Sequence, residues 1–214
     1  MDATTTRFSV SNSQENQSLG NNDLYMKYHK DTMEIIFFAR GGQGAKTAAE
    51  IIAQAAVLEG NFVQTFPNFG PERSGAPTKT YLRISNHAIR TKEPVVDPDV
   101  VVVLDDTLLE SQKVTEGLDK NEALIINSTK SPHEIRDLIR FDGKIHAVDA
   151  NGISMAIVGQ PRPNTVILGK IIKVTEIVKL ESILEEFRKI FEDKIGKENC
   201  EKNILAIEKA YDSI

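Results

Sequence analysis

The sequence predicts a three-layer α/β/α domain, Rossmann-like, with a central and mostly parallel sheet. Three observations predict it. Strand-like apolar runs alternate with segments of helical periodicity from residue 34 onward. Three of the later runs are continuous and apolar, and one is a run of valines, as in strands buried on both faces. A glycine-rich turn also separates the first strand-like run from the first helical segment.

The first half of the chain supplies the pattern for three or four strands and one helix. Gly60 ends the helical segment, and the strand–helix–strand order predicts a βαβ unit whose two strands pair in parallel. A turn at Asn86–His87 would give the third strand, which alternates like a half-exposed one, a short partner. The expected elements are strands at 34–38, 62–66, 78–85 and 88–91, and a helix at 46–58.

The second half supplies the central strands and the remaining helices. The helix expected at 181–195 is strongly amphipathic, with Ile183, Leu184, Phe187, Ile190 and Phe191 at helical spacing. The expected strands are 100–104, 123–127 and 144–148, and the expected helices are 132–140, 153–158, 165–174, 181–195 and 203–211.

The chain divides into a tail and one domain. Residues 1–32 are rich in Ser, Thr, Asn and Gln, and lack the basic start and apolar centre of a secretory signal. We interpret them as a disordered or artificial tail. Residues 33–214 are predicted to form a single domain, long enough to bury a substantial core.

Composition excludes several classes of function. The net charge of −5 argues against a nucleic-acid-binding protein, and no apolar run is long enough to span a membrane. Cys200 is the only cysteine, so the chain has neither an internal disulfide nor the ligands of an iron–sulfur cluster. We therefore expect an intracellular, cytoplasmic protein. Cys200 lies in a charged helical stretch and is interpreted as an incidental, partly exposed thiol.

The glycine loop Arg40–Thr47 (RGGQGAKT) lies between the first strand and the first helix. Backbone N–H groups of such a turn, together with the helix dipole, suit an anion. The loop matches neither the Walker spacing nor the dinucleotide fingerprint, which argues against nucleotide hydrolysis and NAD binding. A tight turn that binds nothing stays open as an alternative. The side chain of Gln43 favours a contact, because it can donate and accept at once.

A second unusual loop follows the second strand. Residues 66–77 combine Pro and Gly with two aromatic residues and the pair Glu72–Arg73. Loops that follow parallel strands lie at the same edge of a sheet. We therefore expect this loop to lie beside the glycine loop.

Several other polar residues have structural interpretations. Asp105–Asp106 and Asp149 end strands, and capping of the next helix is favoured for both over a metal site. Lys46 is expected to be a solvated first-turn residue. The histidines show no ligand spacing and are interpreted as structural or exposed.

An ordered set of motifs resembles the gamma subunit of 2-oxoacid:ferredoxin oxidoreductases, of the pyruvate:ferredoxin oxidoreductase or pyruvate synthase type. The likeness runs from about residue 34 to the C-terminus. The motifs are residues 40–50 (RGGQGAKTAAE), 66–77 (FPNFGPERSGAP), 97–105 (DPDVVVVLD), 148–150 (VDA) and 163–169 (PNTVILG).

The resemblance implies one subunit of an oxidoreductase that converts a 2-oxoacid, CoA and oxidised ferredoxin to acyl-CoA, CO₂ and reduced ferredoxin. It implies that thiamine diphosphate, Mg²⁺ and [4Fe–4S] clusters lie on partner subunits, with none bound by this chain alone. The implied partners are alpha, beta and ferredoxin-like delta subunits, ferredoxin and CoA, with no nucleic acid and no membrane. The expected share of this chain is subunit packing and part of the CoA site.

The resemblance also implies a set of binding residues and no catalytic ones. Arg73 would pair with phosphate or carboxylate, oriented by Glu72. Asn164 and Thr165 either contact the ligand or cap the helix after Pro163. The expected CoA or inter-subunit contacts are Gly41, Gly42, Gln43, Gly44, Glu72, Arg73, Ser74, Asn164 and Thr165.

Three alternatives stay open from the sequence. The chain could be a free-standing nucleotide- or CoA-binding α/β protein. It could be a pure assembly module whose two loops form an interface. It could also be the same subunit in a 2-ketoisovalerate or other 2-oxoacid branch.

Overall fold

The computed structural model describes residues 31–68 and 75–213. Its strands are β1 (Thr32–Arg40), β2 (Phe62–Asn68), β3 (Pro77–Ser85), β4 (Val100–Val103), β5 (Ala123–Asn127) and β6 (Lys144–Val148). Its helices are α1 (Ala45–Leu58), α2 (Leu108–Ser111), α3 (Pro132–Ile139), α4 (Ala150–Ile157), α5 (Pro163–Thr175), α6 (Leu180–Ile195) and α7 (Lys197–Tyr211). The predicted alternation of strands and helices is confirmed.

The described strands form one sheet in the order β2-β3-β1-β4-β5-β6. The pairs β1–β4, β4–β5 and β5–β6 are parallel, and β3 alone runs opposite to the others. A mostly parallel sheet is therefore confirmed.

The predicted parallel pairing of the first two strands is wrong. β3 lies between β1 and β2 and is antiparallel to both, with Ser85 opposite Thr32 on one side and Phe62 on the other. The connection from β2 to β3 is short, and antiparallel neighbours are the strands that a short connection can join. β1 and β2 still point the same way, because each is antiparallel to β3.

Two further expectations for this region are wrong. β3 is not half-exposed: its last six residues are all buried, because β1 and β2 flank it and α1 covers one face. No strand forms at 88–91. That segment instead passes the edge of β2, where the side-chain nitrogen of Gln64 donates to the carbonyl of Thr91 at 2.9 Å.

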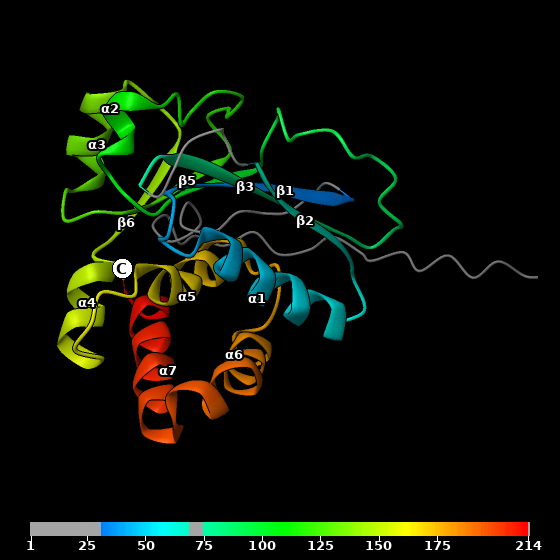
Figure 1. Ribbon diagram of the computed structural model, residues 1–214. Helices are drawn as coiled ribbons and strands as arrows, with labels where there is room; N and C mark the ends of the chain where they lie inside the picture. Colours follow the sequence, from blue (N-terminus) through cyan, green and yellow to red (C-terminus); the bar gives the residue numbers. More distant parts are fainter. Residues whose placement is uncertain (1–30, 69–74, 214) are drawn as a thin grey trace, which may run out of the picture.

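Helices cover both faces of the sheet, which gives the predicted three layers (Figure 1). One apolar core lies between the sheet and α1, α4, α5, α6 and α7, and includes Phe37 and Leu82. The other lies between the sheet and the pair α2 and α3, and includes Ile36 and Ile135. Alternate residues of β1 point into opposite cores, as the period of a strand requires.

Helices α5 and α7 pack unusually closely. A Cβ atom at Gly169 of α5 would lie 2.0 Å from the carbonyl oxygen of Ile207 in α7. Only glycine therefore allows this approach. Helix α7 begins six residues before its predicted start, and Cys200 in its first turns belongs to the apolar core with no exposed surface. The expectation of a partly exposed thiol is wrong, since Cys200 points into the core while Glu198 and Glu201 beside it in sequence are exposed.

Candidate functional site

The glycine loop and the second loop meet at one rim of the sheet. The N–H of Gly41, directly after β1, donates to the carbonyl of Ala76 at 2.8 Å. The N–H of Gly75 donates back to the carbonyl of Gly41 at 3.1 Å. The prediction that the two loops lie side by side is therefore confirmed for Gly41 of the first loop and for Gly75 and Ala76 of the second.

Gln43 fixes the shape of the glycine loop from within the chain. Its side-chain oxygen accepts the N–H of Arg40 at 2.7 Å, and its side-chain nitrogen donates to Asp105 at 2.7 Å. Both polar atoms of the amide therefore already have partners. A contact between Gln43 and a ligand stays a prediction, and the amide of Gln43 connects the loop to the residues after β4.

Arg40 closes the same network. Its guanidinium lies 3.2 Å from Asp105 and donates to the hydroxyl of Thr107 at 2.7 Å. Burial works to raise the pKa of Asp105, but hydrogen bonds from Thr107 and Gln43 and the charge of Arg40 outweigh it and hold that pKa below its ordinary value. Asp105 also accepts the N–H of Thr107 at 3.1 Å. The predicted cap of α2 by Asp105–Asp106 is nevertheless wrong, because Thr107 is the N-cap and no side chain makes a cap hydrogen bond there.

The tip of the glycine loop presents backbone donors. Gly42 and Gly44 have φ of 95° and 82°, a region that glycine enters without steric cost. Gly44 is the N-cap of α1, and no side chain caps the helix there. Within the described residues, the N–H groups of Gly42 and Gly44 have no hydrogen-bond partner. The first-turn N–H groups of α1 are available in the same way.

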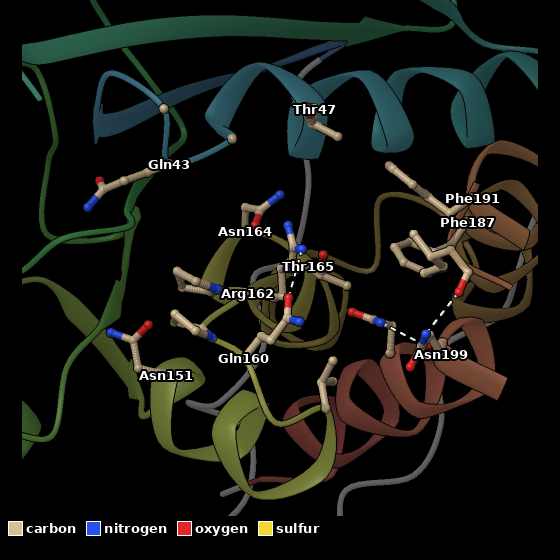
Figure 2. Close-up of a pocket in the computed structure, with 17 residues that line it drawn as sticks. Gln43, Thr47, Asn151, Gln160, Arg162, Asn164, Thr165, Phe187, Phe191 and Asn199 are labelled. Atoms are coloured by element: carbon tan, nitrogen blue, oxygen red, sulfur yellow. Dashed lines mark hydrogen bonds between the residues drawn. The ribbon is translucent and has the colours of Figure 1, made fainter. Parts of the chain in front are cut away.

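The start of α5 lies against this loop. A Cβ atom at Gly44 would lie 2.5 Å from the side-chain nitrogen of Asn164, so a larger residue here would displace the Asn164 side chain from the loop. The alternative that Asn164 and Thr165 cap α5 is wrong, because Arg162 is the N-cap and makes no side-chain cap hydrogen bond. Pro163 already occupies the first helical turn, which places both residues inside the helix. Thr165 is buried, and Asn164 faces the glycine loop (Figure 2).

A buried serine holds the segment between α4 and α5. The hydroxyl of Ser154 donates to the carbonyl of Gln160 at 2.6 Å and accepts the N–H of Arg162 at 2.9 Å. Ser154 has no exposed surface. These two bonds fix the backbone that carries Arg162, whose guanidinium also donates to the side chain of Gln160 at 3.0 Å.

The glycine loop, the start of α5 and the hairpin of α6 and α7 enclose a pocket of about 780 Å³. One end is polar and carries backbone donors of the loop with Arg162 and Asn164 (Figure 2). The other end is apolar and carries Phe187, Phe191 and Ile195 of α6. The pocket therefore suits a ligand with an anionic part and an extended part of lower polarity.

The remaining residues considered from the sequence lie outside the described residues or have structural roles. Glu72, Arg73 and Ser74 lie outside the described residues. Asp149 accepts the N–H of Gly152 at 2.7 Å and caps α4, as predicted. Lys46 is exposed and lies 3.3 Å from Glu50, one helical turn later, as expected of a surface residue. In the described part of the chain, no group of three His, Cys, Asp or Glu side chains could hold a metal ion.

Sequence reasoning missed the far half of the pocket. Arg162 and Gln160 lie in a segment that had no expected role, and Phe187 and Phe191 were assigned to an amphipathic helix face. The only available signal was Arg162 directly before the Pro-Asn-Thr motif. The aromatic residues carried no such signal, because helical spacing predicts burial without naming the element that they face.

Comparison with known proteins identifies the group to which the chain is related. A family described as pyruvate ferredoxin/flavodoxin oxidoreductase matches residues 34–213. The common subunit gamma of pyruvate/ketoisovalerate oxidoreductases from Thermococcus kodakarensis is 47% identical over 84% of this chain and 95% of its own length. Pyruvate synthase subunit PorC from Thermotoga maritima is 40% identical over 88% of this chain and 98% of its own.

A solved structure agrees with these sequence matches. The crystal structure of pyruvate oxidoreductase subunit PORC from Thermotoga maritima superposes with a TM-score of 0.77 at 39% identity, covering 85% of this chain and 96% of that one. No helix in the described part of this chain has the length and apolarity to cross a membrane. The chain belongs to the pyruvate ferredoxin/flavodoxin oxidoreductase family, as a gamma-type subunit of an oxidoreductase.

Proposed function

We propose that this chain is the gamma subunit of a multi-subunit pyruvate:ferredoxin oxidoreductase and that its pocket holds part of CoA. The observation that carries the proposal is the pocket between the glycine loop and the start of α5, in a chain of this family. The enzyme would convert a 2-oxoacid, CoA and oxidised ferredoxin to acyl-CoA, CO₂ and reduced ferredoxin. The subunit acts in the cytoplasm together with alpha, beta and ferredoxin-like delta subunits.

The residues of the pocket fit CoA. Its phosphates would lie at the polar end, where the N–H groups of Gly42 and Gly44, the start of α1 and the guanidinium of Arg162 supply donors and positive charge. The pantetheine chain would extend past Asn199 toward Phe187 and Phe191. This chain would bind and orient CoA and exclude water from it. Thiamine diphosphate, Mg²⁺ and [4Fe–4S] clusters on the partner subunits would supply the carbanion and electron-transfer chemistry.

The experiment compares variants of the purified complex in a methyl viologen assay with pyruvate. We expect Arg162→Ala to raise the KM for CoA about tenfold with kcat nearly unchanged, because a charge-assisted contact is lost. Phe191→Ala tests the apolar end and should also raise this KM. Lys46→Ala is the matched control, because Lys46 is a cation near the start of α1 outside the pocket.

Three results separate this proposal from the alternatives. Loss of the complex on size-exclusion chromatography with Arg162→Ala would favour a pure assembly module. Tight binding of ATP or NAD to the isolated chain in calorimetry would favour a free-standing nucleotide-binding protein. Activity of the complex with 2-ketoisovalerate in place of pyruvate would move the subunit to that branch.

A further inference from the structure

The outer edge of β6 is an open strand edge. β6 pairs with β5 on one side, and no other strand of the described residues pairs with it. The carbonyl of Val148 accepts a hydrogen bond from Ser128 after β5, so the backbone of Val148 points toward β5. Backbone groups alternate along a strand. The N–H and C=O groups of Ile145 and Ala147 therefore point outward.

A groove of about 410 Å³ follows this edge from Gly143 to Ala147. Its two walls come from opposite faces of the sheet. Pro132 and Arg136 belong to α3 on one face, and Lys170 belongs to α5 on the other. The groove shares no residue with the pocket between the glycine loop and α5.

The groove is positively charged although the chain as a whole is negative. Four cationic side chains and one carboxylate, that of Asp142, line it. Within the described residues, none of the four cations lies within ion-pair distance of a carboxylate. The four are Lys120, Arg136, Lys144 and Lys170.

The cations lie on both sides of the strand. Lys144 and His146 share the face of β6 that packs toward α5, as does Val148, while Ile145 packs toward α3. Lys170 is 3% exposed, and its ammonium group donates to the carbonyl of Ser213 at 2.7 Å. Burial, and then the charge of Lys173, lower the pKa of Lys170. An anion in the groove would offset the cost of this buried charge.

His146 adds an unpaired polar atom to the same wall. Its Nε2 is buried and has no hydrogen-bond partner within the described residues. A buried polar atom without a partner is rare in folded proteins, and each case calls for an explanation. A ligand that brings a donor or acceptor along the edge of β6 would supply the missing partner.

We propose that the groove along β6 binds an extended acidic segment of a partner polypeptide, which adds to the sheet as a further strand. An added strand would use the outward N–H and C=O groups of Ile145 and Ala147. Its successive side chains would point alternately to the two faces of the sheet. Acidic side chains on one face would meet Arg136, and those on the other face would meet Lys144 and Lys170. A free phosphate compound would use the cations but leave the open backbone edge unpaired.

The test measures binding of a fluorescent, blocked peptide of about eight residues to the purified full chain by anisotropy, since that length exceeds the five residues of β6. The peptide consists of Glu pairs separated by Thr and Val. We expect saturable binding that Lys144→Glu and Arg136→Glu each weaken at least about tenfold. Lys92→Glu is the control, because it makes the same charge change on an exposed loop near β2, the opposite edge.

A second variant tests the backbone part of the proposal. Ala147→Pro removes one outward N–H without removing a hydrogen bond to β5, as proline on an edge strand can. We expect it to weaken the peptide about tenfold while the thermal unfolding midpoint stays within a few degrees. The proposal would be overturned in favour of a small-anion site if inorganic pyrophosphate displaced the peptide and bound equally well to the unmodified chain and to Ala147→Pro. Equal binding of a peptide with Gln in place of Glu, or no saturable binding, would also overturn it.

Discussion

The side-chain nitrogen of Gln43 lies 2.7 Å from Oδ2 of Asp105, a residue 62 positions later in the chain. This contact joins the loop after β1 to the end of the neighbouring parallel strand β4. The glycine loop is therefore held in its shape by the protein itself before any ligand arrives. Such preorganisation lowers the entropic cost of binding.

We expect Gln43→Glu to destabilise the fold by about 1–3 kcal/mol, because Asp105 loses a donor and faces a second carboxylate. The new side chain can still accept the N–H of Arg40, so the variant isolates the contact with Asp105. Urea unfolding measures the change. Lys46→Ala should leave the free energy of unfolding nearly unchanged. Equal stability of Gln43→Glu and the unmodified chain would show that the contact does not hold the loop.

Gly169→Ala tests the packing of α5 on α7. Helix propensity alone predicts that the change stabilises α5 by about 1 kcal/mol. The added Cβ would lie 2.0 Å from the carbonyl oxygen of Ile207, and a backbone atom cannot move aside as a side-chain end can. We therefore expect a net loss of about 1–3 kcal/mol in the free energy of unfolding. A gain in stability would contradict the observed helix spacing.

His146 predicts a pH dependence of stability. Burial, and then the charges of Lys170 and Lys144, lower its pKa from 6.5 to about 4. The unfolded chain therefore binds a proton at His146 before the folded chain does. His146 therefore leaves the free energy of unfolding nearly unchanged above about pH 6.5. It lowers this free energy as the pH drops from about 6.5 toward 4, by about 3 kcal/mol at most.

Urea unfolding at several pH values measures this loss, with His146→Gln as the comparison. The variant should show a flatter dependence between about pH 6.5 and 4.5. The carboxylates whose pKa values are lowered, such as Asp105 and Asp106, affect stability only further down the pH range. An equally steep decline in both proteins over this window would assign the loss to other groups.

Cys200 is expected to resist thiol reagents in the folded protein. It has no exposed surface, and burial, followed by the nearby charges of Glu192 and Glu201, raises its pKa. Burial keeps the reagent away from the thiol, and the raised pKa reduces the fraction of thiolate, which is the form that such reagents attack. Alkylation should be at least about a hundredfold slower in buffer than in urea, since it requires local or global opening. Rapid modification of the folded chain would contradict the burial of Cys200 in the core.

The order of elements was predictable, because local patterns encode it. Strands β5 and β6 match their predicted bounds, and β4 differs by one residue. Helix α3 also begins at its predicted residue, where Ser131 and Glu134 form a capping box. Helices α4 and α7 begin several residues before prediction, because their first turns are polar or glycine-containing and carry little apolar periodicity.

Only the part of the candidate site formed by the glycine loop, at the rim of the sheet, was predictable from the sequence. The glycine loop was found because Gly42 and Gly44 need positive φ, which is a local property that the sequence records. Arg162, Phe187 and Phe191 were missed, because their place in the pocket depends on how α5, α6 and α7 pack on one another. The hydrogen bond from Gln43 to Asp105 was also missed, because Asp105 lies 62 positions later in the chain.

The sequence by itself determined the α/β class, the mostly parallel sheet, the positions of β4, β5 and β6, and the family resemblance. Each depends on residue type and spacing over short distances, which hydrophobic burial and backbone sterics translate directly into structure. The tertiary structure decided that β3 lies between β1 and β2, that α5 meets the glycine loop, and that cations gather along the edge of β6. These features depend on contacts between segments distant in sequence, whose energies no local pattern records.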